Sequence, residues 1–294
     1  MDKLEKLEMK QRKREIKEQK KALKALEKKE RLELEEAYMQ DKLAEKEIYK
    51  DINAAKKEAY IKKMTPVWEE RKRLNEAPHL SVLEEIGNAN THGVGAILTI
   101  IALILLLMKS DTTLKIIASI VYCTAMFFMF FNSCLYHSWK WGSKVKRIWR
   151  RFDYTSIYLM IAGTFAPLQL IEIPSEYGNP AGYIFGITYF ACMWAIVITG
   201  ITLTCVFGPG RTKKINFPLY FIVGWSGVCV VPGWIIHDNI PLLLWILFGG
   251  IVYTLGMIPF GLLRGKKSAH FIWHFIVMAG VVIQFIGIYL CVYK

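Results

Sequence analysis

Long apolar stretches beyond residue 80 constrain the fold of this chain more than any other feature. Several reach the roughly 17–25 residues that a helix needs to cross a bilayer. In lipid, every backbone N–H and C=O must find its partner within the chain, so such stretches are expected to be helices. The sequence therefore predicts an all-α bundle of seven transmembrane helices, at 82–108, 114–137, 153–172, 182–205, 217–236, 241–262 and 269–292.

The N-terminal quarter of the chain has a different composition. Residues 1–76 hold 23 Lys/Arg and 18 Asp/Glu, and residues 1–65 contain no Gly or Pro. We predict a long charged helical arm over 1–76, followed by a membrane domain over 77–294, with Pro66 and Pro78 breaking the helical pattern between them. The arm either remains a mobile charged helix, self-associates as a weak coiled coil, or contacts anionic lipid headgroups.

Loop charge predicts the orientation, because Lys and Arg are retained in the cytosol. The loops 138–152, 206–216 and 263–268 hold 12 basic residues, whereas the alternate loops hold 2. We therefore expect an integral plasma-membrane protein with its N-terminus in the cytosol and its C-terminus outside. A membrane also accounts for the net charge of +13 better than nucleic acid does, so no nucleic-acid partner is expected.

Histidines in the predicted spans indicate a metal site, because ionisable groups within a membrane are expensive and usually functional. His270 and His274 are four residues apart and share one helix face, a spacing that can chelate one ion. The topology places His137 and Asp153 at the same depth. Three histidine ligands would leave a tetrahedral Zn²⁺ with one open position. We predict a zinc site of His137, His270 and His274; the alternative is a set of packed or hydrogen-bonded histidines.

Two polar side chains near this site are candidates for catalysis. Ser133 lies one helical turn before His137 and can share its face. Asp153 could orient a histidine or handle a proton. The alternatives are a serine bonded to a carbonyl one turn back, and an ion pair of Asp153 with Arg150 or Arg151.

A polar stripe opens the first predicted span. Glu85, Asn88 and His92 fall on roughly one helix face at the cytosolic side. They are candidates for the surroundings of the metal site, where they would hydrogen-bond across helices. Equally, they could form an interfacial polar face.

Five stretches of the sequence also resemble, in order, the motifs of the hemolysin III family. This family is related to the adiponectin and progestin receptors and, more distantly, to the alkaline ceramidases. The match covers about residues 80–294. The stretches are EIGNANTHG from Glu85 to Gly93, SCLYH from Ser133 to His137, DYTSIYLMIAGTFAP from Asp153 to Pro167, GGIVYTLG from Gly249 to Gly256 and HFIWH from His270 to His274.

The resemblance implies a seven-helix core with zinc held near the cytosolic side. In this chain the implied ligands are again His137, His270 and His274, with Ser133 and Asp153 beside the metal. Tyr253, within the fourth stretch, is a further candidate for its surroundings. The chain departs from the family pattern at two positions, neither a proposed ligand: Tyr154, where many members have His, and Phe165, where Tyr is usual.

Residues and resemblance together favour a zinc-dependent lipid hydrolase, and among such enzymes an amidase for ceramide-like substrates. Membrane lipid would then supply the substrate or ligand. One alternative is a lipid-responsive regulator or receptor-like protein, without enzymatic activity, in which zinc ties helices together. Another is a cytolysin, which is disfavoured because no predicted span has the repeating polar stripe that a water-filled pore needs.

Overall fold

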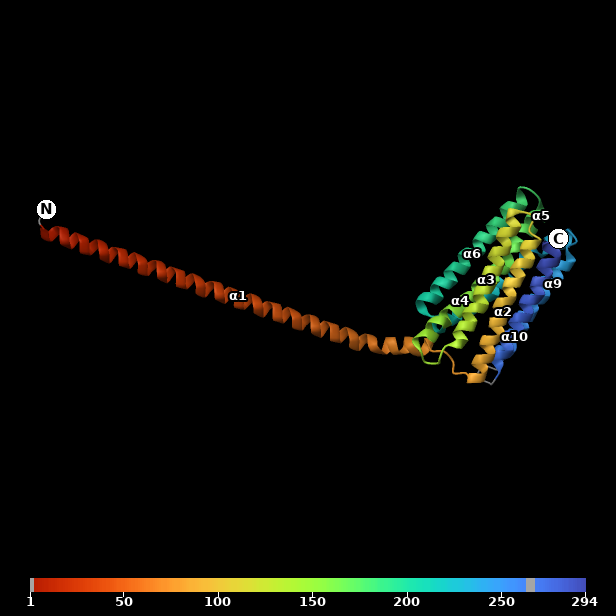
Figure 1. The fold of residues 1–294 in the computed structure, drawn as a ribbon, viewed down its shortest axis with the longest axis horizontal. Helices are drawn as coiled ribbons and strands as arrows, with labels where there is room; N and C mark the ends of the chain where they lie inside the picture. The colour runs from red at the N-terminus through yellow and green to blue at the C-terminus, as the bar shows by residue number, and fades with distance from the viewer. Residues whose placement is uncertain (1–2, 263–267) are drawn as a thin grey trace. The chain divides into compact units, whose positions relative to one another are not determined.

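A computed structural model describes residues 3–262 and 268–294 (Figure 1). The chain divides into two compact units, Met1–Glu70 and Arg71–Lys294. Every element in the described residues is a helix, which confirms the predicted all-α class. The basic residues Arg264, Lys266 and Lys267 of one predicted loop lie outside the described residues.

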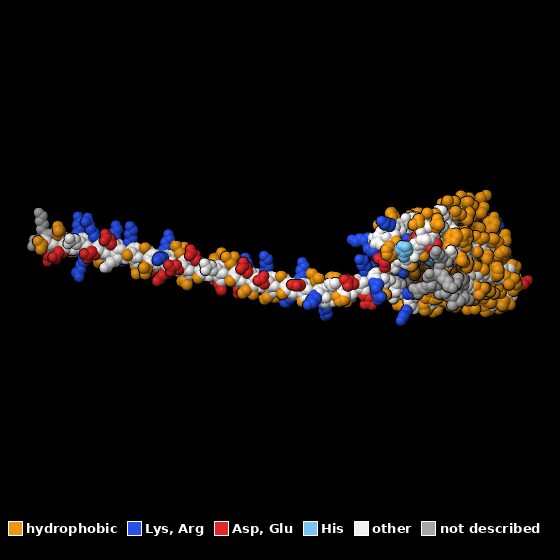
Figure 2. Space-filling view, turned by 90° about the horizontal axis from the view of Figure 1, so that it is seen from below, with side chains coloured by type: hydrophobic (Ala, Val, Ile, Leu, Met, Phe, Trp, Pro, Cys, Tyr) orange, Lys and Arg blue, Asp and Glu red, His pale blue; other side chains and the backbone are white. Residues whose placement is uncertain are grey.

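The N-terminal residues form one helix, α1 (Lys3–Asn75). Acidic and basic side chains are interspersed with apolar ones along its exposed surface (Figure 2). The break predicted at Pro66 was wrong, because α1 passes through this residue. An interior proline removes one N–H from the helix ladder and crowds the carbonyl four residues before it, which kinks a helix without always ending it. Just before Pro66, the Thr65 hydroxyl donates to the carbonyl of Ile61 at 2.7 Å.

Seven helical segments in the described residues are long and apolar enough to cross a membrane, as predicted. The third, fifth and seventh spans are each composite, with short π or 3₁₀ turns. The elements are α2 (Val82–Met108), α3 (Thr113–Ser138), α4 (Lys144–Pro167), η1 (Leu168–Glu172), α5 (Ile173–Tyr177), α6 (Ala181–Phe207), α7 (Pro209–Trp225), η2 (Ser226–Val230), α8 (Val231–Ile236), α9 (Ile240–Leu262), α10 (Ala269–Gly287) and η3 (Ile288–Val292).

The transmembrane helices pack side by side as a bundle with an apolar exterior. Helix α3 packs against α2 and α4, while α10 packs against α9 and α2 (Figure 1). Large apolar side chains such as Ile97, Ile187 and Leu244 are exposed on the outside, where hydrophobic groups predominate (Figure 2). In water such a surface would be unfavourable, so it fits a protein surrounded by lipid.

Two helices begin earlier than their apolar residues suggest. Helix α4 starts at Lys144 and α7 at Pro209, whereas the predicted spans started at 153 and 217. A helix does not end where its apolar part ends: the Ser143 hydroxyl accepts from the Lys146 N–H at 3.1 Å and caps α4 in the charged segment. We call the end of the bundle with the 139–143 loop the basic end. Its helical basic residues, predicted to lie in loops, are Lys144, Lys146, Arg147, Arg150, Arg151, Arg211, Lys213 and Lys214.

The last residues of α1 belong to the same compact unit as the bundle and pack on its basic end. The Asn75 amide donates to the carbonyl of Phe207 at 3.3 Å and accepts from the Gly210 N–H at 3.2 Å. Gly208 has a φ of +85°, and a Cβ there would lie 2.1 Å from the Asn75 side chain. Glycine is therefore required at this turn, where Asn75 holds α6 and α7 together.

Candidate metal centre

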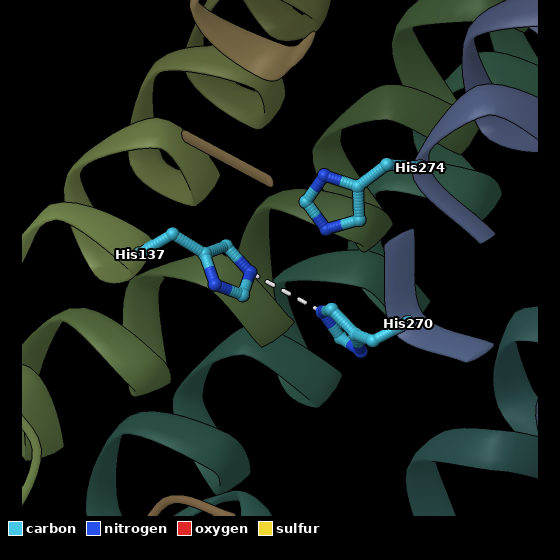
Figure 3. A group of neighbouring side chains, drawn as sticks. All are labelled: His137, His270 and His274. Atoms are coloured by element: carbon cyan, nitrogen blue, oxygen red, sulfur yellow. Dashed lines mark hydrogen bonds between the residues drawn. The ribbon is translucent and has the colours of Figure 1, made fainter. Parts of the chain in front are cut away.

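Three histidines from two helices converge at the basic end of the bundle. His137 lies in the last turn of α3, and His270 and His274 lie in the first turns of α10. One ring nitrogen from each lies within 4.8 Å of the others, and Nε2 of His137 is 3.2 Å from Nε2 of His270 (Figure 3). His137 and His274 are buried and His270 is partly buried. This group could hold a metal ion.

The spacing of the nitrogens suits metal coordination. Two nitrogens bound to one tetrahedral zinc at about 2.0–2.1 Å lie roughly 3.3 Å apart. The 3.2 Å between His137 and His270 matches that separation. Without an ion, two imidazole nitrogens this close require a shared proton, since two lone pairs repel each other.

Neighbouring groups set which nitrogen of two histidines faces the cluster. Nδ1 of His137 lies 2.7 Å from Oε2 of Glu85, a carboxylate oxygen that only accepts. The Thr91 hydroxyl donates to the carbonyl of Asn88 at 3.0 Å, so it can accept from Nδ1 of His274 at 3.3 Å. Both rings then carry their proton on Nδ1 and leave Nε2 as a metal ligand, the usual arrangement at metal sites.

Lys146 belongs to this site although it was not among the predicted site residues. Its side chain is fully buried, and Nζ lies 2.7 Å from Oε1 of Glu85. The same ammonium donates to the carbonyls of Tyr136 and Trp139, each at 3.1 Å. The residue therefore contacts both the carboxylate that binds His137 and the helix end that carries it.

Asp153 and Ser133 lie together beside the histidines, on the wall of a common cavity. The Ser133 side chain neighbours the Asp153 carboxylate. Arg150 and Arg151 instead donate to backbone carbonyls, those of Glu76 and Cys205, at 2.9 and 2.8 Å. Among the described ion pairs, none joins Asp153 to either arginine, so the structure does not support that alternative.

The other residues predicted to surround the metal site lie around the three histidines in different ways. The ring of His92 stacks on that of His274, with centroids 3.7 Å apart, while Asn88 is fully buried one turn before it. Tyr253 lines the same cavity as Asp153. In the part of the chain that the structure describes, the side-chain polar atoms of all three lack a hydrogen-bond partner. Buried polar groups without partners commonly face water or a ligand.

A cavity of about 230 Å³ extends from the histidines into the membrane domain. Its polar end includes Ser133, Asp153, His270 and His274, and its deep end reaches Gln284. At 1.5 Å per residue, the 14 positions from His270 to Gln284 span about 21 Å of α10. The walls between are mostly apolar, with Ile157, Phe165, Phe221, Trp225 and Val277 among them.

Two glycines and two exposed aromatic residues define the sides of this cavity. Gly224 and Gly250 line it, and a Cβ built at either meets no atom within 4 Å. Phe217 and Phe221 of α7 line it as well, and these side chains are 45% and 46% exposed. The cavity therefore reaches the surface of the bundle that faces lipid.

Comparison with known proteins gives matches over the membrane domain. Residues 80–285 match the family model described as haemolysin-III related. The chain is 36% identical to Hemolysin-3 of Bacillus cereus, a match that covers 69% of this chain and 90% of that protein. It is 28% identical to the Hemolysin-3 homolog of Bacillus subtilis (strain 168), covering 70% and 92% of the two chains. It is 24% identical to the human Monocyte to macrophage differentiation factor, covering 72% and 85%.

Proposed function

This chain belongs to the hemolysin III family of integral membrane proteins, and we propose that it is a zinc-dependent lipid hydrolase acting on ceramide-like amides. One observation supports the proposal most strongly. Two of the three clustered histidines, His270 and His274, line the polar end of a long apolar cavity together with Asp153. Such a site can accept a lipid with its acyl chain in the cavity and its amide beside the histidines.

The donor set fits zinc. Three imidazole nitrogens are the protein ligands of one common class of catalytic zinc site, in which a fourth position stays open. Bound there, zinc would supply Lewis-acid polarisation of a carbonyl and would make water more acidic. Glu85 and Thr91 fix two of the rings with Nε2 toward the cluster, which favours binding of a cation.

The remaining steps fall to residues of the chain. Asp153 is placed to accept a proton from the attacking water and to deliver it to the leaving amine. Its neighbour Ser133 would hold the carboxylate in orientation. The apolar walls would bind the acyl chain and exclude bulk water, and the opening beside Phe217 and Phe221 would admit a lipid from the bilayer.

We also propose an orientation for the site. Basic residues concentrate at the end of the bundle where the histidines lie, and the positive-inside rule assigns this end to the cytosol. The N-terminal helix would then be cytosolic and the C-terminus outside, in the plasma membrane. The hydrolase would act on lipids from the cytosolic side.

A second candidate function is a lipid-responsive regulator in which the metal is structural. It is favoured by the position of the histidines, because His137 on α3 and the pair on α10 would be tied together by one ion. In that case the cavity would bind a lipid ligand without cleaving it.

The experiment that separates the two functions is a hydrolysis assay on the purified protein. Lipid amides and esters of varied acyl length would be supplied in mixed micelles, and released fatty acid measured by mass spectrometry. The hydrolase predicts cleavage of at least one amide, lost on chelation and in His274→Ala. A protein with its full metal content that cleaves no lipid in the panel would favour the regulator.

A further inference from the structure

We infer that Lys146 is a positioning residue for the metal site, acting through Glu85 on His137. The inference rests on the metal-binding part of the proposed function and not on hydrolysis. It assigns a role to a basic residue that the charged composition of its segment alone would place in a loop at the membrane surface.

The geometry forms a continuous chain of contacts. Nζ of Lys146 lies 2.7 Å from one oxygen of Glu85, and the other oxygen lies 2.7 Å from Nδ1 of His137. Each carboxylate oxygen thus has a separate partner. The lysine holds the carboxylate in place, and the carboxylate holds the imidazole with Nε2 directed at the cluster.

The lysine also fixes the helix end that carries this ligand. Its ammonium has three N–H donors and three acceptors: the Glu85 oxygen and the carbonyls of Tyr136 and Trp139. These carbonyls flank His137, where α3 ends and intrahelical partners are missing. Ring orientation and backbone position are therefore controlled by the same group.

Burial explains why this arrangement points to function. The Lys146 side chain is 0% exposed and that of Glu85 is 15% exposed. Burying two charges is unfavourable, and a buried pair often stabilises a fold no better than apolar side chains would. A fully buried lysine at this position is better explained by the ligand that it positions than by stability.

The next residue provides a matched control. Arg147 lies in the same turn of α4, but its guanidinium donates to Glu76 at 3.0 Å and to the carbonyl of Gly142 at 2.9 Å. Replacing it removes a basic side chain of similar length from the same helix without touching the histidines.

The test is binding of Co²⁺, whose visible spectrum reports coordination geometry, to the metal-free full-length protein. Lys146→Met should bind cobalt about 10–100-fold more weakly, the usual cost of losing an outer-sphere partner, and should show an altered spectrum. Arg147→Met should match wild type in both. Glu85→Gln should weaken binding too, and the two changes combined should cost less than the product of their separate effects, because they act on one pathway.

Each outcome decides the inference. Wild-type affinity and spectrum in folded Lys146→Met would overturn it, and fully multiplicative effects would overturn the route through Glu85. If Lys146→Met does not fold, the double variant, which leaves neither charge unpaired, provides the test. Wild-type cobalt binding in that variant would again overturn the inference. Absence of cobalt from wild type would overturn the metal site itself, whereas bound cobalt without lipid cleavage would affect only the hydrolase proposal.

Discussion

Replacement of Asp153 by Asn tests the proposed chemistry with little change in structure. The two side chains have nearly the same shape, and an amide oxygen can accept a hydrogen bond as a carboxylate oxygen does. The change removes the negative charge of the side chain together with its ability to take up and release a proton. If the site is hydrolytic, the variant should keep its metal and lose its activity.

The expected loss of activity follows from the proton-transfer role assigned to Asp153. General acid–base catalysis contributes about 10²–10⁴-fold, which corresponds to roughly 2.7–5.4 kcal/mol of barrier height. Stability should change little, by about 1 kcal/mol or less, because Arg150 and Arg151 bind backbone carbonyls and lose no ion pair. Activity and stability should therefore separate in this one variant.

The assay is the rate of fatty-acid release at saturating lipid, with metal content and thermal unfolding measured on the same samples. Ser133→Ala is the matched control: it leaves the carboxylate in place and should reduce the rate less than Asp153→Asn does. Cleavage by Asp153→Asn at the wild-type rate would refute the assignment of the proton to this carboxylate. Loss of metal from the variant would show that Asp153 supports the ligands instead.

Three further predictions concern the cavity, the arm and the topology. Gly250→Leu should fold, because a Cβ there meets no atom within 4 Å, and should shift cleavage or binding toward shorter acyl chains in a chain-length series. Deletion of residues 2–70 should leave the membrane unit folded and metal-loaded, whereas deletion of 2–76 removes the Asn75 contacts and should lower its melting temperature in detergent. A single cysteine in the 139–143 loop of a cysteine-free protein should resist impermeant reagents in intact cells; labelling from outside would reverse the proposed orientation.

The fold could be predicted from sequence because membrane spans depend on local composition. Seven apolar stretches of sufficient length gave seven spans. The predicted positions of the helix ends were less accurate. Apolarity marks the part of a helix in lipid, whereas α4 and α7 continue into charged turns that their backbone hydrogen bonds and the Ser143 cap stabilise.

The candidate site was predictable where topology alone brought residues to one depth. His137 and the pair on α10 were identified in this way, and the structure brings all three together. Lys146 was missed because it was assigned to a loop. The sequence does contain a pattern that could have identified it. Lys146, Arg150 and Asp153 follow one another at spacings of four and three, so on a helix they share one face.

Other features depend on tertiary packing and could not be read from the sequence. The packing of Asn75 against Gly208 and Gly210 brings together residues more than 130 positions apart. The cavity exists because α7 packs on α4 and α6 while α9 packs on α10, and because Gly224 and Gly250 leave space between them. Neither the separation of helices nor an empty volume is encoded in local periodicity.

Metal content of the purified protein tests the central claim most directly. Elemental analysis of wild type beside His137→Ala, His270→Ala and His274→Ala, all purified with zinc present, compares proteins that differ only in a proposed ligand. The account predicts about one zinc per wild-type chain and strongly reduced zinc in each variant, because three protein ligands are needed to hold an open zinc site. Equal zinc in all four proteins, or none in wild type, would contradict it.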